Sequence, residues 1–457
     1  MGTKLKAESL SFFESIIMGV AGSAPGFSIA VAIAGLLATA GKVSPNALLI
    51  FALPMLGIAV AYKGLNRKMP NAGAAYEWTK SQFGGFFGYF SGWALLVAAM
   101  VFMVTGSVPL GTATIDLFDP SLASNVWLTT SIGAVWFLII GLILIAGIEL
   151  TSKIQVVMSS IELGILLIIS VAAFVHSGTA GTVSPFSWSW FGFSYPAGTF
   201  AASSLSVVFL YWGWDVTSNL AEETKGHHRN DAGQGGFLSI FITIASFVAF
   251  TVAALMMFTL SDASGFSDNL IYHVAIAAGL GKAGAYAASL ALMLSSIATL
   301  ETTMLQFSRT LFAMGRDRAL PSYFGIVHER TITPARTMYL LIAVGLVMIF
   351  ASSFMPSVSE ILSDSVAAIA VQVCYYYGLA GLVCAWVYRD SYKTSLGTFL
   401  HYAVYPALSA VALIGLGLYA ISTFNVLTKV VGIGGLAIGL LFFRSKGYTR
   451  PALVAAE

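Results

Sequence analysis

Apolar runs as long as a membrane-spanning helix recur along almost the whole 457-residue chain, and this feature restricts the fold more than any other. A helix needs about 20 predominantly apolar residues to cross a bilayer. Polar residues, glycines and prolines divide the runs into about twelve segments of this kind. Their predicted bounds are 15–39, 46–65, 86–113, 126–147, 154–176, 198–218, 237–260, 283–314, 335–354, 362–388, 399–422 and 428–443. The sequence therefore predicts an all-α polytopic membrane protein.

The charge content agrees with this class. Only 9% of the residues are charged, whereas soluble domains carry roughly 25%. If the N-terminus lies in the cytoplasm, all but three of the 22 Lys and Arg residues fall on the cytoplasmic side, and the exceptions are Lys42, Lys282 and Lys429. Cytoplasmic loops carry an excess of such residues. We expect a multi-pass protein of the cell membrane with both termini in the cytoplasm.

The first segment contains residues that break helices. It reads GVAGSAPGFSIA over residues 19–30, with Gly22, Pro25 and Gly26 inside the apolar run. Glycine costs about 1 kcal/mol and proline about 3 kcal/mol in a helix interior. Backbone freed within a membrane is tolerated only inside protein or beside a cavity. Pro25 suits the first turn of a restarting helix, whose free N–H groups would favour an anion at mid-membrane.

The sixth segment is interrupted in a similar way. Residues 206–224 read SVVFLYWGWDVTSNLAEET, in which Gly213 lies between two tryptophans and Asp215 follows. A carboxylate within a span is costly and usually functional. A packing glycine with Asp215 as a helix cap is the structural alternative. The parallel interruption five spans earlier favours the functional interpretation.

Two interruptions five spans apart suit an inverted repeat of five plus five helices. The odd offset places the second copy upside down in the membrane, and the substrate would lie between the two breaks. We expect a single transporter domain over residues 1–457, with repeats at 10–176 and 198–388 and two additional peripheral helices at 399–443.

Four stretches of the chain resemble the amino acid–polyamine–organocation permeases. The first is the glycine-rich break at 19–26. The others read PNAGAAYEW from Pro70 with FGGFFGYFSGW up to Trp93, WGWDVTSNLAEE at 212–223, and SRTLFAMGRDRALP at 308–321. Each stretch alone is a weak signal, but their order and spacing over most of residues 15–340 are specific. The resemblance implies a LeuT-type fold and secondary transport of an amino acid or an amine.

The resemblance also implies where the substrate binds, namely at the backbone of both breaks and the side chains beside them. The expected substrate-binding residues are Gly22, Ser23, Ala24, Gly26, Phe209, Tyr211, Trp212, Gly213, Trp214 and Asp215. Carbonyl groups at helix ends favour a substrate ammonium, and the aromatic rings would cover it by cation–π contact. Phe209 is a candidate gate. Core packing is the alternative for each of these rings.

The fifth span departs from the family pattern. Some family members place a lysine nine residues after the lysine that corresponds to Lys153, and Glu162 stands at that position here. Nine residues rise about 13.5 Å along a helix, which places Glu162 near mid-membrane. Its charge there requires a proton or a cation. We expect a coupling site for a proton, or else for sodium, and a structural, hydrogen-bonded Glu162 is the alternative. The expected coupling residues are Glu162, Ser295, Ser296, Thr299 and Glu301.

A second departure is Pro25, which removes one N–H group that could bind a substrate carboxylate. The predicted function is secondary transport of amino acids by alternating access, coupled to protons. Transport or exchange of amines or polyamines without a carboxylate is the alternative, favoured by Glu162, Asp215 and this missing N–H group. A channel is a more distant alternative, because no repeated filter sequence is visible.

Several other functions are not expected. The spans offer no nucleophile–base pair or metal cluster for an enzyme, and no GxxxxGK[ST] motif indicates an ATP-driven pump. No basic tract suits nucleic acid. Cys374 and Cys384 are expected to be free thiols, since ten helical residues separate them by about 15 Å. We therefore expect no metal and no cofactor. The expected partners are an amino acid or amine substrate, a coupling ion and the lipid bilayer.

Overall fold

The computed structural model describes residues 3–443 except 178–182, 194–196, 227–228 and 267–268, and its regular structure there is helical. Among these residues, ten helical segments are long and apolar enough to cross a membrane. They are α1–α2 (Phe12–Ser23 and Pro25–Val31), α3–α4 (Ile33–Ala40 and Ser44–Lys68), α6 (Gly85–Asp116), α7 (Val126–Ala146), α8 (Ile148–Ser177), α11 (Asp231–Met257), α13–α14 (Leu270–Ala275 and Gly281–Arg316), α15 (Ala335–Ser352), α16 (Val358–Val387) and α17–α18 (Leu396–Phe399 and Tyr405–Thr423). The protein is therefore a polytopic helical membrane protein, as predicted.

The other two predicted spans are present as shorter helical stretches. The sixth is divided into α9 (Ala197–Leu210) and α10 (Val216–Asn219), and neither piece alone reaches the length of a span. The twelfth consists of α19 (Val426–Lys429), the π-helix η9 (Val430–Gly434) and α20 (Gly435–Phe442). The twelve predicted segments thus correspond to ten long spans and two shorter stretches.

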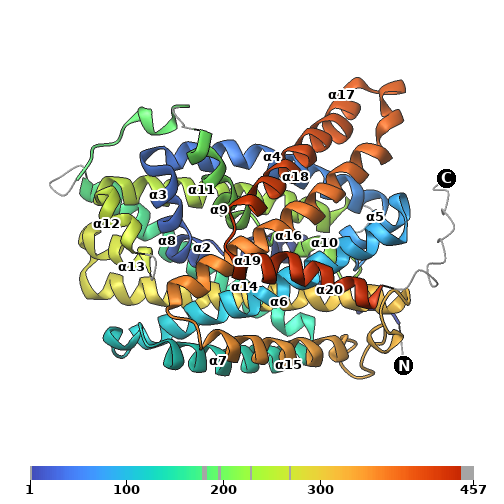
Figure 1. Cartoon of the computed structure of the whole chain (residues 1–457), viewed down its shortest axis with the longest axis horizontal. Helices are drawn as coiled ribbons and strands as arrows, with labels where there is room; N and C mark the ends of the chain where they lie inside the picture. The colour runs from blue at the N-terminus through green and yellow to red at the C-terminus, as the bar shows by residue number, and fades with distance from the viewer. Residues whose placement is uncertain (1–2, 178–182, 194–196, 227–228, 267–268, 444–457) are drawn as a thin grey trace.

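Short helices connect the spans. Two short helices, α12 (Leu260–Gly265) and α13, lie between α11 and α14. The remaining connections include α5 (Ala75–Phe83), η1 (Gly41–Val43), η2 (Pro120–Leu122), η3 (Trp188–Phe191), η5 (Ile276–Leu280), η6 (Ser322–Phe324), η7 (Arg389–Lys393) and η8 (Leu400–Val404). Figure 1 shows the long helices running along the horizontal axis. The end at which α5 lies is called the N-terminal face below, and α12 and α13 lie at the opposite end.

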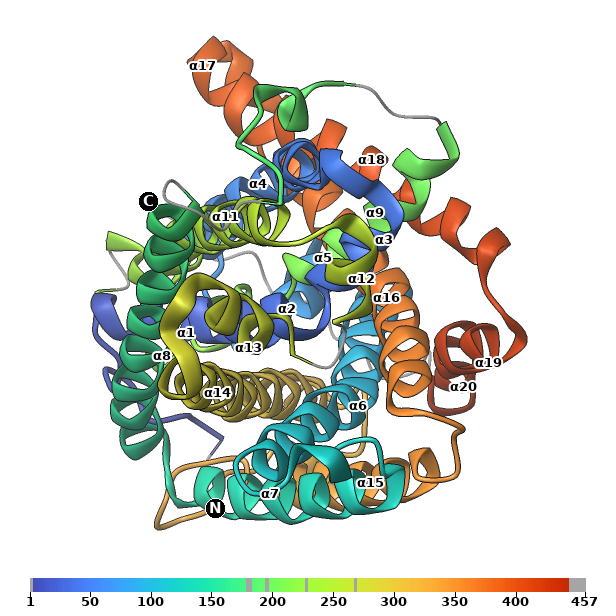
Figure 2. The same cartoon turned by 90° about the vertical axis from the view of Figure 1, so that its left-hand side faces the viewer.

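Figure 2 looks along the helices and shows α1 and α2 inside the bundle. They pack against α8, α11 and α14, and α6 packs against α14 and α16. Most residues of α6 are buried, as expected for a helix that is apolar on all sides. The helices at the rim instead expose apolar side chains, such as Leu167 and Val171 on α8 and Leu408 and Val411 on α18. Those exposed faces are where lipid would lie.

The last two spans lie at the rim of the bundle (Figure 2). α18 packs against α4 and α16, and α20 packs against α6. Two side chains of α6 donate hydrogen bonds to backbone carbonyl oxygens of α20: the Tyr89 hydroxyl to Gly439 at 3.0 Å and the Trp93 indole N–H to Gly435 at 2.9 Å. Polar contacts therefore supplement apolar packing in holding the twelfth stretch against the third span.

Candidate functional site

The first break lies at Ala24, between α1 and α2. α1 ends at Ser23, α2 begins at Pro25, and Ala24 between them has φ 47° and ψ 68°. The Ala24 N–H donates to the carbonyl oxygens of Val20 and Ala21 at 3.0 and 3.2 Å, which closes the end of α1. Pro25 occupies the first helical position, where a missing N–H is no disadvantage. The predicted break is present, and its turning residue is an alanine in the left-handed region.

The second break lies between α9 and α10. α9 ends at Leu210 and α10 begins at Val216, so residues 211–215 form the interruption. Gly213 within it has φ 102°, a backbone conformation that glycine adopts readily and other residues rarely do. The Val216 N–H donates to the Gly213 carbonyl oxygen at 3.2 Å and starts the next helix. The interruption is therefore built around the glycine that the sequence indicated.

The two breaks lie against each other. A Cβ atom added to Gly22 would overlap the carbonyl oxygen of Gly213, and one added to Gly213 would overlap the carbonyl oxygen of Gly22. Only glycine at both positions lets the two backbones approach so closely. Thr299 of α14 contacts the first break, because its hydroxyl donates to the Gly22 carbonyl oxygen at 3.2 Å. Backbone segments from the first and sixth spans thus meet at one place inside the bundle.

Glu162 of α8 occupies the N-terminal end of α2. Its Oε1 accepts the Gly26 N–H at 2.7 Å, and the side chain is almost fully buried. Oε2 has no hydrogen-bond partner among the described residues. The N-terminus of a helix favours an anion. Because Pro25 has no N–H, the Gly26 amide is the first available donor of α2, and Glu162 already binds it.

The polar residues predicted on α14 do not all reach this site. A Cβ atom on Gly26 would lie 3.0 Å from the Ser295 Cβ and 3.1 Å from Glu162 Oε1, so these three residues are neighbours. Thr299 contacts the first break through the hydrogen bond to Gly22. The Ser296 hydroxyl is buried without a partner in the described part of the chain. Glu301 is buried, and no hydrogen bond joins it to either break among the described residues.

Asp215 is held by three neutral donors from two other spans. Its carboxylate accepts hydrogen bonds from the Gln306 amide at 2.7 Å, the Tyr376 hydroxyl at 3.1 Å and the Tyr377 hydroxyl at 2.8 Å. Asp215 is fully buried, and no Lys or Arg forms an ion pair with it among the described residues. The sequence interpretation missed these partners. The consecutive tyrosines at 375–377 in an apolar run were the available signal.

Two of the predicted aromatic residues form a cluster with rings from other spans. The Phe209 ring lies 6.5 Å from the Phe27 ring and 6.4 Å from the Phe102 ring, measured between centroids. The Trp212 ring lies 5.4 Å from Phe102, and its indole N–H donates to the Tyr376 hydroxyl at 2.6 Å. Phe27, next to Gly26, places this cluster beside the first break. Phe27 and Phe102 were not among the predicted residues.

The other two aromatic residues of the second break pack elsewhere. The Tyr211 hydroxyl donates to the Leu48 carbonyl oxygen of α4 at 3.2 Å, and its ring packs on Phe247 of α11. Trp214 packs between Tyr62 and Tyr377, at 5.2 and 5.6 Å between ring centroids. Tyr211 therefore contacts neighbouring helices rather than the first break.

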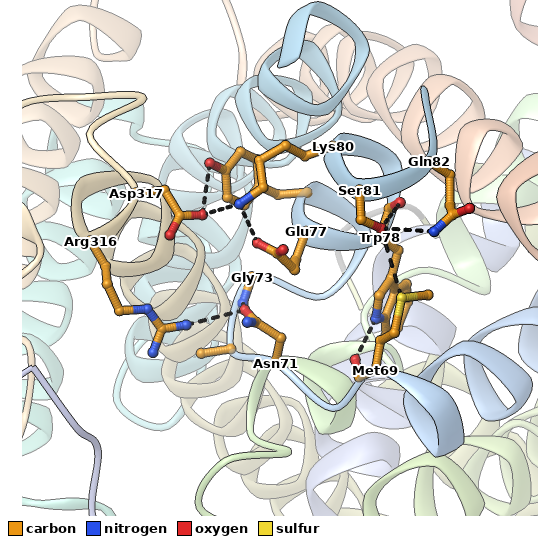
Figure 3. A network of polar contacts seen from close by, with 12 residues as sticks. Met69, Asn71, Gly73, Glu77, Trp78, Lys80, Ser81, Gln82, Arg316 and Asp317 are labelled. Carbon is orange, nitrogen blue, oxygen red and sulfur yellow. Dashed lines mark hydrogen bonds and ion pairs between the residues drawn. The ribbon is translucent and has the colours of Figure 1, made fainter. Parts of the chain in front are cut away.

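A polar network holds together the loops at the N-terminal face (Figure 3). Lys80 of α5 lies between Glu77 and Asp317 and forms an ion pair with each. The Tyr76 hydroxyl also donates to Asp317, at 3.1 Å. Burial raises the pKa of the Glu77 carboxyl, and the attraction of Lys80 only partly opposes this shift. These contacts join the segment that follows α4 to the end of α14.

Two parallel ion pairs extend this network towards the end of the sixth span. Arg316 binds Glu222 through both of its terminal nitrogens, at 3.1 and 2.9 Å, and is partly exposed. Arg309, about two turns deeper on α14, binds Glu223 through two hydrogen bonds of 2.9 Å, and both side chains are buried. All four residues belong to the stretches that resemble the permease family. Their ion pairs join α14 to the end of the sixth span.

The cysteines and the possible metal ligands do not form a site among the described residues. Cys374 and Cys384 are both free and buried, as expected from their spacing. Across the described ranges, no group of three or more His, Cys, Asp or Glu side chains is arranged to hold a metal ion.

Comparisons with known proteins identify the family. A family model described as "Amino acid permease" matches residues 10–441. The uncharacterized amino acid permease YecA of Bacillus subtilis is 28% identical over 76% of this chain and 78% of its own length. Cationic amino acid transporter 8, vacuolar, of Arabidopsis thaliana is 24% identical over 84% of this chain and 64% of its own length. The low-affinity putrescine importer PlaP of Escherichia coli is 24% identical over 89% of this chain and 87% of its own length. The chain therefore belongs to the amino acid permease family of the amino acid–polyamine–organocation superfamily, and it is a membrane transporter rather than an enzyme.

Proposed function

We propose that this protein is a secondary active transporter that moves amino acids across the cell membrane together with protons, by alternating access. The observation that carries the proposal is the hydrogen bond from the Gly26 N–H to Glu162. It places an ionisable carboxylate at the helix end where the family resemblance puts the substrate. The contact between Gly22 and Gly213 supports a single binding site built from both breaks, as an inverted repeat of a LeuT-type fold requires.

Competition for one helix end explains how a proton would be coupled to substrate. An ionised Glu162 and an ionised substrate carboxylate repel each other, so they do not share the N-terminus of α2. Protonation removes the charge and weakens the hydrogen bond to Gly26, because charge-assisted hydrogen bonds are roughly twice as strong as neutral ones. The Gly26 N–H then becomes available to the substrate carboxylate. By linkage, a substrate that binds only when Glu162 is protonated also strengthens proton binding.

The rest of the substrate would lie between the breaks. Backbone carbonyl groups at the end of α1 favour the substrate ammonium, and the rings of Phe209 and Trp212 lie near enough to Phe27 to cover it. Asp215, which has three neutral donors, holds the second break to α14 and α16 and adds negative charge to that region. These positions suit a small substrate with one ammonium and one carboxylate group.

Orientation follows from the charge distribution. The predicted topology assigns all but three of the 22 Lys and Arg residues to the side of the N-terminus, and we therefore place the N-terminal face in the cytoplasm with both termini. In this structure the ion pairs of Lys80 and Arg316 hold that face together. Opening towards the cytoplasm would require these pairs to separate, which is the movement that alternating access demands.

The second candidate function is transport or exchange of amines or polyamines without a carboxylate. Pro25 and Glu162 leave few free N–H groups at the end of α2, and Asp215 supplies a buried negative charge. The similarity to a putrescine importer points in the same direction. A sodium ion is the alternative coupling ion, since the Glu162 and Ser295 side chains offer oxygen atoms.

Matched pairs of ligands separate these two functions. We expect amino acids to stabilise the purified protein against heat, and the corresponding decarboxylated amines to have no effect. A ligand at 100 times its Kd stabilises the folded state by about 2.7 kcal/mol. Alanine with ethylamine tests a substrate with one ammonium group, and ornithine with putrescine tests one with two. The members of each pair differ only in the carboxylate, so each pair is its own control. Stabilisation by the amines and not by the amino acids would reject the amino acid proposal in favour of the alternative.

The Glu162→Gln variant tests whether Glu162 carries the coupled proton. Glutamine has the shape of a protonated glutamate but cannot titrate, so uptake into proteoliposomes is expected to lose its dependence on external pH. For the unaltered protein we expect acidification to raise uptake by at least about fivefold, the lower end of usual coupling. Glu149→Gln is the matched control, because Glu149 lies at the exposed end of the same helix. A Glu162→Gln protein with unchanged pH dependence would exclude Glu162 as the proton site.

A further inference from the structure

The buried face of α8 carries a line of polar residues that ends at Glu162. Ser152, Gln155, Ser159 and Glu162 are all buried and follow at intervals of three, four and three residues. Residues at such spacing share one side of a helix, with about 5–6 Å between successive Cβ atoms. The opposite side of α8 is apolar and exposed, with Val157 as an example. The polar line therefore faces the interior of the bundle and runs from mid-membrane to the N-terminal face.

Several polar atoms along this line are buried without a hydrogen-bond partner. They include Gln155 Oε1, Ser159 Oγ and Glu162 Oε2, none of which is bonded to another described residue. The remaining polar group of Gln155 is used, because its amide donates to the Ala298 carbonyl oxygen of α14 at 2.8 Å. Buried polar atoms in proteins almost always have a partner, and water takes that place where protein does not. The atoms on this face are thus suited to bind a row of water molecules.

A second carboxylate lies along the same interface. Leu294, Ile297 and Ala298 of α14 pack in one cluster with Ile154 and Met158 of α8. Glu301 follows Ala298 by three residues and Ile297 by four, so it projects from the side of α14 that faces α8. Glu301 is 2% exposed, and its Oε2 has no partner in the described part of the chain. Glu301 lies nearer to the N-terminal face than Ala298 does on α14. In the same way, Ser152 lies nearer to that face than Gln155 does on α8.

The line reaches the surface at the start of α1. The Ser152 hydroxyl donates to Oε1 of Glu14 at 3.0 Å, and Glu14 is partly exposed. Lys6 and Glu149 form an ion pair at the same end. The other ionisable groups on helices that pack against α8 are Lys282, Tyr286, Arg309 and Arg316 on α14, Asp231 on α11, and Tyr272 and His273 on α13. Of these, Arg309, Arg316 and Asp231 are already in ion pairs, with Glu223, Glu222 and Arg229.

We propose that this face of α8 is a hydrated proton path between Glu162 and the N-terminal face, with Glu301 as an intermediate proton acceptor. The inference rests on the proposed function, in which Glu162 carries the coupled proton. Release breaks the O–H bond of Glu162 as a neighbouring water gains the proton, and each later carrier passes one proton on, so the charge is conserved. The path is separate from the substrate route, because it runs along α8 and α14 rather than between the two breaks.

The double variant Gln155→Leu/Ser159→Val tests the path by making its middle apolar. Proton transfer through a positioned group commonly contributes 100-fold or more, so we expect proton-coupled net uptake to fall by at least about tenfold. Exchange of internal for external substrate at equal pH is expected to remain, because a loaded carrier can return without releasing its proton. The matched control is Ser160→Val on the same helix, where the serine is exposed and bonded to the Val156 carbonyl oxygen.

Proton entry is read from a pH-sensitive dye inside the proteoliposomes, and ligand-induced thermal stabilisation verifies that the variants still fold and bind. If the double variant does not fold, Ser159→Val alone is used, because the Ser159 hydroxyl has no hydrogen-bond partner among the described residues. Loss of proton entry with intact exchange supports the path. Proton entry equal to that of Ser160→Val overturns it and leaves the proposed function standing. Substrate uptake by the unaltered protein without any proton entry overturns both.

Discussion

Replacing Gly22 by alanine is expected to reduce substrate uptake to the level of empty liposomes. The new Cβ atom would overlap the carbonyl oxygen of Gly213, which is backbone and cannot rotate aside as a side chain does. Overpacking of this kind costs about 3 kcal/mol, and each 1.4 kcal/mol is roughly a tenfold change in an equilibrium. The two breaks would be pushed apart at the place where the substrate is proposed to bind. Uptake by purified protein in proteoliposomes measures the effect.

Gly35→Ala is the matched control for this prediction. Gly35 lies in α3, and a Cβ atom added there meets nothing within 4 Å, so uptake should stay close to that of the unaltered protein. Gly213→Ala should be at least as harmful as Gly22→Ala, because its φ of 102° adds backbone strain to the overlap. A Gly22→Ala protein that transports as well as Gly35→Ala would mean that the close contact between the breaks is dispensable.

Replacing Arg309 by alanine is expected to cause the largest loss of stability. Arg309 and Glu223 are 1% and 0% exposed and share two hydrogen bonds of 2.9 Å. Removing the guanidinium leaves the Glu223 carboxylate buried without its cation, which costs about 3–5 kcal/mol. The Glu223 carbonyl oxygen also accepts the N–H groups of Ser9 and Leu10, so the N-terminal segment should loosen as well. The midpoint of thermal unfolding in detergent measures the change.

The neighbouring pair supplies the control. Arg316 and Glu222 have the same two-pronged geometry, but their side chains are 24% and 23% exposed. Solvated ion pairs contribute about 1 kcal/mol or less, so Arg316→Ala should lower the midpoint much less. The double variant Arg309→Met/Glu223→Leu should recover most of the loss, because no isolated charge remains. Equal shifts for Arg309→Ala and Arg316→Ala would show that burial does not set the cost of breaking these pairs.

The helical class and the two interruptions were predictable from sequence. Hydrocarbon offers no hydrogen-bond partners, so the chain must form helices wherever its apolar runs are long enough. For the same reason Gly22, Pro25 and Gly213 stand out in the sequence. Glycine and proline destabilise a helix, and backbone groups left without hydrogen bonds are costly in a membrane. The structure places the breaks at Ala24 and around Gly213, within a few residues of the predicted ones. The short second half of the sixth span, α10, was not expected from its hydropathy.

The partners of the polar groups were much harder to predict. Asp215 was recognised, but Gln306, Tyr376 and Tyr377 were not, because these residues lie 91 to 162 positions away along the chain. Glu301 was grouped with Ser295 as part of one site. Six residues are about 1.7 helical turns, so the two side chains are about 120° apart around α14 and about 9 Å apart along it. Only Ser295 lies beside Gly26.

The sequence by itself therefore determined the helical membrane class, the positions of the two breaks and the family, because these follow from hydropathy and local motifs. The tertiary structure alone decided that the breaks touch and that Glu162 binds Gly26 rather than another donor. It also decided that Asp215 is surrounded by neutral donors. The physical reason is that such contacts depend on how each helix is rotated and placed against its neighbours. Many side chains of both helices contribute to that packing, and the hydropathy of a single helix does not predict it.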